Sequence, residues 1–136
     1  MLYSLCYISN AVKLWQQDQL HQLYNSCKLR NRINGITGIL IYCEGTFIEV
    51  LEGKMDRLHH LFSQIRNDER HDQITLMLDS PIEHRLFNTF RTASLNLSSL
   101  KLLNSFELEL QRQKPSKYTK KLQAIIKPFF EPAHVF

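Results

Sequence analysis

The chain has 136 residues, of which 43% are hydrophobic and 22% are charged, a balance typical of one soluble globular domain with a buried core. Four glycines and four prolines exclude a low-complexity chain, and the net charge of +4 is a mild basic excess. No apolar run is long enough to cross a bilayer and no signal peptide is visible, so we expect a cytoplasmic protein.

The periodicity of the first half predicts three strands and one helix: strands over Leu2–Ile8, Ile36–Tyr42 and Thr46–Glu52, and a helix over roughly residues 16–30. Leu5 and Tyr7 share one face of the first strand. A turn signal, Asn34-Gly35, precedes the second strand. Gly45 lies in a short hairpin turn between the second and third strands.

The second half predicts a helix, a strand and a helical tail: an amphipathic helix from Met55 to Ile65, a strand over Ile74–Ser80, a helix around residues 100–110 and another after Pro115, ended by Pro128 and Pro132. The order β-α-β-β-α-β is the split-βαβ pattern of ferredoxin-like α+β folds. Both inner helices should cover one sheet face, and the C-terminal helix pair should cover the other.

Glu49 is the one ionisable group in the middle of an apolar strand. It shares its face with Phe47 and Leu51, and neither strand face is plainly polar. Burying an unpaired charge is costly, so Glu49 must be neutral, paired or lining a polar cavity. The pattern alone leaves two explanations open. Glu49 is a functional carboxyl, or it forms a salt bridge or lies at an exposed edge position.

Other candidate residues have simpler explanations. Tyr7 could reach across the sheet or be a core tyrosine bonded to a carbonyl. Asn31 follows the first predicted helix and could cap it or bind a ligand's carbonyl and imide groups. The segment Asp68–His71 is expected to close the second helix, where cations are favourable without a ligand.

Neither the cysteines nor the basic tail indicates a ligand. Three cysteines without CxxC spacing suggest free thiols in a reducing compartment. The adjacent pair His59-His60 cannot form an i, i+4 metal site, and we assign no metal. Five lysines in the last quarter indicate a solvated helix face, with a nucleic-acid or acidic-partner patch as the weaker alternative: Lys114, Lys117, Lys120, Lys121 and Lys127.

Five sequence blocks follow one another with a specific spacing: LYSLCYIS, NRINGITGILIY, FIEVLEG, IRNDERH and SPIEHRLF. Together they resemble the BLUF domain, a blue-light sensor that uses flavin, over roughly residues 1–92. The whole chain resembles the short BLUF proteins, which have a C-terminal helix pair and no fused effector domain. The resemblance implies a flavin-binding domain over residues 1–96 and a helical extension packed on it over residues 97–136.

The resemblance also implies a cofactor and its contacts. The cofactor is FAD, with FMN as the alternative, held between the two helices on the sheet. Tyr7 matches the tyrosine that donates an electron and a proton to the excited flavin, and Asn31 matches the asparagine that hydrogen-bonds the ring. The other matching cofactor positions are Ile36, Ile65, Asp68, Arg70 and His71.

Three positions depart from the family pattern. Glu49 replaces the glutamine that bridges the tyrosine to the flavin and rearranges after light. Phe90-Arg91-Thr92 replaces a tryptophan-serine-methionine segment in the strand that relays the signal. Gln64 replaces an arginine common in the second helix.

These departures lead us to expect flavin binding with a weakened, shifted or pH-sensitive light response. Only a neutral Glu49 could accept a hydrogen bond from Tyr7 and donate one to flavin. The expected function is photoreception without net turnover, signalling in trans to a regulatory protein and through a homo-oligomer. The alternatives are a light-insensitive binding module of the same fold and, least supported, a flavin-dependent enzyme. Membrane and nucleic-acid partners are not expected.

Overall fold

The computed structural model describes residues 1–95 and 116–130, and the chain divides into two compact units, Met1–Ser94 and Leu95–Phe136. Up to residue 95 its elements are β1 (Leu2–Ala11), α1 (Gln17–Ile33), β2 (Thr37–Cys43), β3 (Thr46–Lys54), α2 (Met55–Arg66), β4 (His71–Pro81) and β5 (Phe90–Leu95). The first six confirm the predicted β-α-β-β-α-β order. Periodicity alone did not predict β5, although the family resemblance placed a strand at its start.

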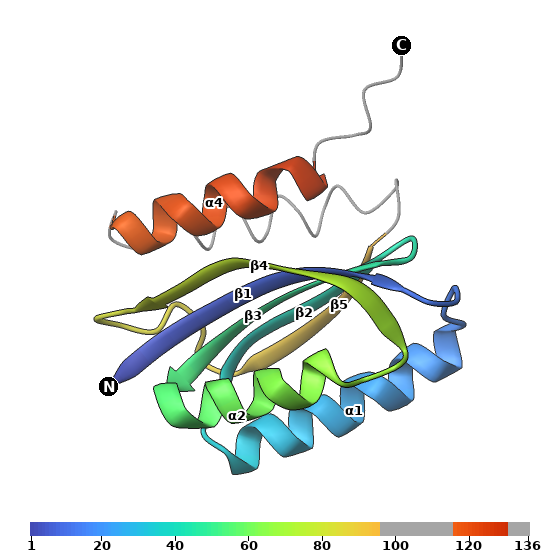
Figure 1. Cartoon of the computed structure of the whole chain (residues 1–136), viewed down its shortest axis with the longest axis horizontal. Helices are drawn as coiled ribbons and strands as arrows, with labels where there is room; N and C mark the ends of the chain where they lie inside the picture. The colour runs from blue at the N-terminus through green and yellow to red at the C-terminus, as the bar shows by residue number, and fades with distance from the viewer. Residues whose placement is uncertain (96–115, 131–136) are drawn as a thin grey trace. The chain divides into compact units, whose positions relative to one another are not determined.

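The sheet has the strand order β4-β1-β3-β2-β5, with β3 in the centre between β1 and β2. β1 pairs antiparallel with β3 and with β4, and β2 pairs antiparallel with β3. Helices α1 and α2 lie on the same face of this sheet (Figure 1). The fold is therefore the predicted ferredoxin-like α+β arrangement, and it places the middle of β3 under both helices.

Two predicted helix boundaries were wrong. α1 continues to Ile33, so Asn31 lies within the helix and Asn34 forms its C-cap. Gly35 follows with a φ of 66°, a left-handed conformation that glycine adopts readily and that ends the helix. α2 ends at Arg66 and β4 begins at His71, so the segment Asp68–His71 connects these elements instead of closing α2.

Gly38 brings β2 close to the backbone of β3. Its φ is 144°, and a Cβ atom at this position would lie 1.8 Å from the carbonyl oxygen of Val50. Only glycine fits this contact. In the resulting register Leu40 lies opposite Glu49, and Glu49 lies opposite Tyr7 on the other side. The close approach therefore helps to align the residues in the middle of the sheet.

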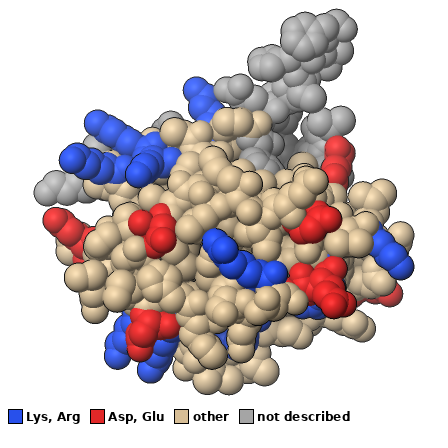
Figure 2. Space-filling view, viewed as in Figure 1, with Lys and Arg blue, Asp and Glu red and all other residues tan. Residues whose placement is uncertain are grey.

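The second unit contains α4 (Lys117–Phe130). Its four lysines are exposed, as expected for a solvated helix face, and basic side chains gather over this helix in Figure 2. α4 continues two residues past Pro128, so the prediction that Pro128 ends it was wrong. The helix expected around residues 100–110 lies outside the described residues. No helix in the described ranges combines the length and the apolar character needed to span a membrane.

Candidate functional site

Tyr7 and Glu49 face each other across the β1–β3 pair in the centre of the sheet. The strand register places their Cα atoms opposite each other. Both side chains are buried, with 4% and 2% of their surface exposed. The Tyr7 hydroxyl donates a hydrogen bond of 2.7 Å to Oε1 of Glu49. Glu49 is therefore neither at a sheet edge nor in a salt bridge, the two simpler alternatives that its sequence context allowed.

The second carboxyl oxygen of Glu49, Oε2, is buried and has no hydrogen-bond partner. Burial raises the pKa of Glu49 to about 7, although the Tyr7 hydrogen bond and the positive charge of Arg30 act to lower it. Burial also raises the pKa of Tyr7 well above 10.0, so Tyr7 keeps its proton. Because Tyr7 donates to Oε1, the proton of a neutral Glu49 resides on Oε2, where it can be donated to a guest.

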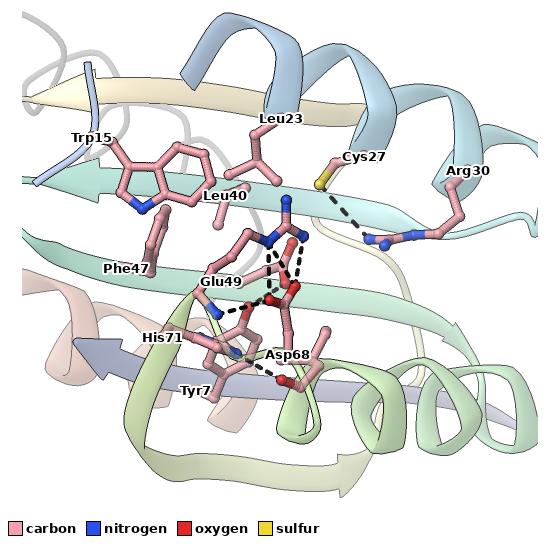
Figure 3. Close-up of a pocket in the computed structure, with 12 residues that line it drawn as sticks. Tyr7, Trp15, Leu23, Cys27, Arg30, Leu40, Phe47, Glu49, Asp68 and His71 are labelled. Carbon is pink, nitrogen blue, oxygen red and sulfur yellow. Dashed lines mark hydrogen bonds and ion pairs between the residues drawn. The ribbon is translucent and has the colours of Figure 1, made fainter. Parts of the chain in front are cut away.

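Tyr7 and Glu49 line a small cavity that strands β1 to β3 and both helices help to enclose (Figure 3). Its volume is about 60 Å³, which is room for only a few water molecules. A wider cleft of about 800 Å³ adjoins it, and this size lies within the range of small-molecule sites. Five residues line both spaces, so the cavity is the inner end of the cleft: Trp15, Leu23, Cys27, Arg30 and Arg70.

Arg70 lines both the cavity and the cleft, and Asp68 lines the cavity beside it. The Nε atom of Arg70 lies 2.9 Å from Oδ1 of Asp68, and the guanidinium carbon lies 5.7 Å from the ring centroid of Trp15. The hydrogen bond from Arg70 lowers the pKa of Asp68, which keeps this carboxyl ionised. A guest larger than the inner cavity therefore reaches Glu49 only if side chains that line the cavity move, and the half-exposed Arg70 is one of these.

His71 also lines the cavity, but both of its ring nitrogens are engaged within the protein. Nδ1 lies 2.7 Å from Oγ of Ser9, and Nε2 lies 2.6 Å from the carbonyl oxygen of Ile65. A carbonyl can only accept, so Nε2 carries a hydrogen. His71 therefore presents its ring to the cavity, 6.1 Å from the ring of Tyr7, and has no nitrogen left to bond a guest.

The structure brings six of the eight predicted site residues to this cavity: Tyr7, Glu49, Ile65, Asp68, Arg70 and His71. Ile36 instead lines a separate cavity beside Arg57 and Gln64. Asn31 is fully buried but is not among the lining residues. Its Oδ1 atom accepts a hydrogen bond of 3.3 Å from Nε of Arg30, which does line the cavity.

Six further lining residues were not predicted: Trp15, Leu23, Cys27, Arg30, Leu40 and Phe47. Leu23 and Cys27 are four residues apart on the inner face of the predicted helix, a spacing that indicates burial but not a cavity. Leu40 could have been found from the hairpin register, since it lies opposite Glu49. Trp15 and Arg30 carried no signal in the sequence.

The polar atoms of the site fit the flavin that the family resemblance implies. Within the described residues, two buried side-chain atoms lack a hydrogen-bond partner, Oε2 of Glu49 and Nδ2 of Asn31. Glu49 lines the cavity, and its Oε2 is a donor when it carries the proton, whereas the amide nitrogen of Asn31 is a donor that lies outside the cavity lining. A flavin ring offers carbonyl oxygens and a ring nitrogen that accept such bonds. The ring is larger than the inner cavity, so its entry requires side chains that line the cavity to move.

Comparison with known proteins identifies a family. The family model described as BLUF, sensors of blue-light using FAD, matches residues 2–93. Photoactivated adenylate cyclase subunit beta of Euglena gracilis is 33% identical over 86 residues, which are 63% of this chain and 10% of that protein. Subunit alpha is 32% identical over 88 residues, or 65% of this chain and 9% of that protein. The chain thus spans about a tenth of the length of these curated relatives.

Solved structures agree in fold. Klebsiella pneumoniae BlrP1, determined with FMN and cyclic diGMP, superposes with a TM-score of 0.76 at 29% identity. The match covers 93% of this chain and 35% of the BlrP1 chain. The BLUF protein BlrB in its dark state has a TM-score of 0.68 at 26% identity. The match covers 91% of this chain and 96% of the BlrB chain. The family match extends over the sheet and both helices that form the cavity. The chain therefore belongs to the BLUF family, the sensors of blue light that use FAD.

Proposed function

We propose that this chain is a flavin-binding blue-light receptor whose photoactive pair is Tyr7 and Glu49. The single observation that supports this pair most strongly is the 2.7 Å hydrogen bond from Tyr7 to Oε1 of Glu49, beside a second oxygen that is buried and unpaired at the same cavity. A tyrosine and a carboxyl in this arrangement can pass a proton between them. They also leave one polar atom available to a guest.

A bound flavin would supply the absorption of blue light and the capacity to accept an electron. The chain's own residues would then have distinct tasks. Tyr7 would give up an electron and its hydroxyl proton, and a neutral Glu49 would take that proton on Oε1 while releasing the proton on Oε2 toward the guest. Asn31 and the proton on Oε2 of Glu49 orient the ring. Ile65 and the ring of His71 pack against it, and Asp68 holds Arg70 in place.

Glu49 makes this light response depend on pH. The neutral acid accepts from Tyr7 and donates through Oε2, whereas the ionised carboxylate accepts only and repels a carbonyl oxygen. With a pKa of about 7, Glu49 changes between these states near neutral pH. A glutamine, which has no ionisable group, would give a response without this dependence.

The signal passes to a regulatory protein in trans, through a homo-oligomer, and without net turnover of a substrate. The named relatives support an effector as the target, because they are adenylate cyclase subunits in which the matched segment is a small part. A cytoplasmic location is part of this proposal and rests on the three free thiols, Cys6, Cys27 and Cys43.

The test is an absorption spectrum of the purified full chain before and after blue light, recorded over a pH series. We expect a yellow protein whose reversible red shift is largest at acidic pH and fades as pH rises through about 7. Glu49→Gln should give a red shift that does not vary with pH. A red shift that is equally pH-independent in the natural protein and in Glu49→Gln would contradict the assigned role of Glu49.

A light-insensitive binding module is the second candidate. It is favoured by one observation, the small volume of the inner cavity at Glu49, where the Arg70–Asp68 ion pair lines the wall. A protein that purifies colourless and takes up neither FAD nor FMN on titration would support this candidate over the light receptor.

A further inference from the structure

Tyr24 ties α1 to the end of β5 through two hydrogen bonds. Its hydroxyl donates to the carbonyl oxygen of Ala93 at 3.1 Å and lies 2.6 Å from Oγ of Ser94. A tyrosine hydroxyl has one hydrogen, so with that hydrogen on Ala93 it accepts the hydrogen of Ser94. The Tyr24 side chain is 8% exposed, and both hydrogen bonds are partly buried.

Tyr24 also lies beside the cavity of the candidate site. It follows Leu23 and precedes Cys27 by three residues on α1, and both of these neighbours line the cavity. It belongs to the same buried hydrophobic cluster as Leu40, another lining residue, and Phe90, the first residue of β5. Within the described residues, the Tyr24 hydroxyl forms no hydrogen bond with Tyr7 or Glu49.

The two partners of Tyr24 lie at a defined place in the chain. Ser94 is the last residue of the first compact unit, and Leu95 begins the second. Ser94 is therefore joined by one peptide bond to the first residue of the second unit. The family's tryptophan and methionine are absent from β5, where Phe90, Arg91 and Thr92 stand instead.

We propose that Tyr24 is a positioning residue that couples the cavity to the junction between the two units. The proposal rests on the proposed function, because light supplies the change that Tyr24 would transmit. Arg30 and Cys27 place α1 in the cavity wall, so a change in the hydrogen bonds offered by Glu49 alters the forces on this helix. α1 moves as a rigid element, and Tyr24 carries its displacement to Ala93 and Ser94.

A purely structural tie between α1 and β5 would stabilise the dark protein without changing on illumination. The distinguishing readout is therefore the difference between light and dark at β5. Tyr24→Phe removes only the hydroxyl and keeps the ring in the core. Ser94→Ala removes one of the two bonds from the strand side. Tyr3→Phe is the matched control, because the Tyr3 hydroxyl bonds Asp79 on β4, which is not one of the residues that line the cavity.

The experiment measures amide hydrogen exchange of the full flavin-loaded chain in darkness and under blue light, together with its absorption spectrum. In darkness, Tyr24→Phe should speed exchange at the end of β5 by about fivefold or more, because it removes both hydrogen bonds to Ala93 and Ser94. Under light, the natural chain and Tyr3→Phe should change their exchange over residues 90–95. Tyr24→Phe and Ser94→Ala should lose most of that change while keeping the normal red shift.

A normal red shift with an undiminished light-induced change at β5 in Tyr24→Phe and Ser94→Ala would overturn the proposal. It would also be overturned if the natural chain shows the red shift but no change in exchange at β5. Absence of a red shift in the natural chain contradicts the light receptor itself, and the spectrum reveals that failure before any variant is compared.

Discussion

Glu49 and Glu52 stand three residues apart on β3, and both are buried, but their hydrogen bonding differs completely. Oε2 of Glu49 has no partner. Both oxygens of Glu52 are engaged: Oε2 accepts from the backbone N–H of Leu86 at 2.8 Å, and Oε1 accepts from that of Phe87 at 3.1 Å. Side chains alternate along a strand, so the two carboxyls lie on opposite faces. One belongs to the cavity and the other fastens the loop before β5.

The first prediction concerns the pH dependence of stability. The pKa of Glu49 is raised from 4.5 to about 7, so between these values the folded chain binds more protons than the unfolded chain. The free energy of unfolding therefore falls as pH rises from about 4.5 through 7, by on the order of 3 kcal/mol from this group. Urea unfolding of the flavin-free protein over a pH series measures the slope.

Glu49→Gln is the matched variant for this slope, since the amide has similar shape and no charge. It should flatten the decline of stability near neutral pH. Glu83→Gln, at an exposed position, should leave the decline as it is. If Glu49→Gln keeps the full slope, another group causes it and Glu49 does not titrate in this range.

The second prediction concerns Tyr7. Tyr7→Phe removes the donor to Oε1 of Glu49 and should cost about 1 kcal/mol of stability. Since the Tyr7 hydrogen bond lowers the pKa of Glu49, its loss should also move the pH midpoint of the stability curve upward. The flavin-loaded variant should lose its red shift. Tyr42→Phe, at another buried tyrosine, should retain both the midpoint and the red shift.

The third prediction concerns Glu52 as an anchor. Glu52→Gln places an N–H₂ group where a carboxylate oxygen accepts from a backbone N–H, so two donors face each other. We expect a loss of about 1–3 kcal/mol in the free energy of unfolding and faster proteolysis within residues 82–89. Glu83→Gln lies in the same loop and serves as control. Equal stability and equal proteolysis of the two variants would show that Glu52 does not hold the loop.

The fourth prediction concerns the close approach at Gly38. Gly38→Ala forces a Cβ atom against the Val50 carbonyl oxygen at a φ of 144°. The combined strain and overlap should cost about 3 kcal/mol or more. At Gly53 an added Cβ atom meets its nearest neighbours at 3.4 Å, so Gly53→Ala should be much milder. A shift of the thermal midpoint that is as large for Gly53→Ala as for Gly38→Ala would contradict the assigned contact.

Much of the fold could be predicted because hydrophobic periodicity is local. β2 and β3 were found within about two residues at each end. β1 was predicted to stop at Ile8 but runs to Ala11, because Asn10 pairs with Thr46 and with Asp72 on its two sides. Such cross-strand partners are distant in sequence. A periodic pattern cannot show them, and a polar residue such as Asn10 then looks like a strand end.

The site was predicted less completely than the fold. The sequence marked Glu49 because a carboxyl between apolar residues is costly, and the family pattern supplied Tyr7. It could not show that Asn31 lies inside α1, since the helix end is decided by the backbone at Asn34 and Gly35. Nor could it show the Arg70–Asp68 pair at the cavity wall, which depends on a connection without regular structure.

The register between β1 and β3 has a consequence for engineering this chain. A slip of one residue would put Ile48 or Val50 opposite Tyr7 and turn the carboxyl of residue 49 to the other side of the sheet. An insertion in the tight turn between β2 and β3 would similarly change the β2–β3 register, which sets Leu40 opposite Glu49, without replacing any residue of the cavity. Tags and grafted loops therefore belong elsewhere, and this hairpin should be kept at its natural length.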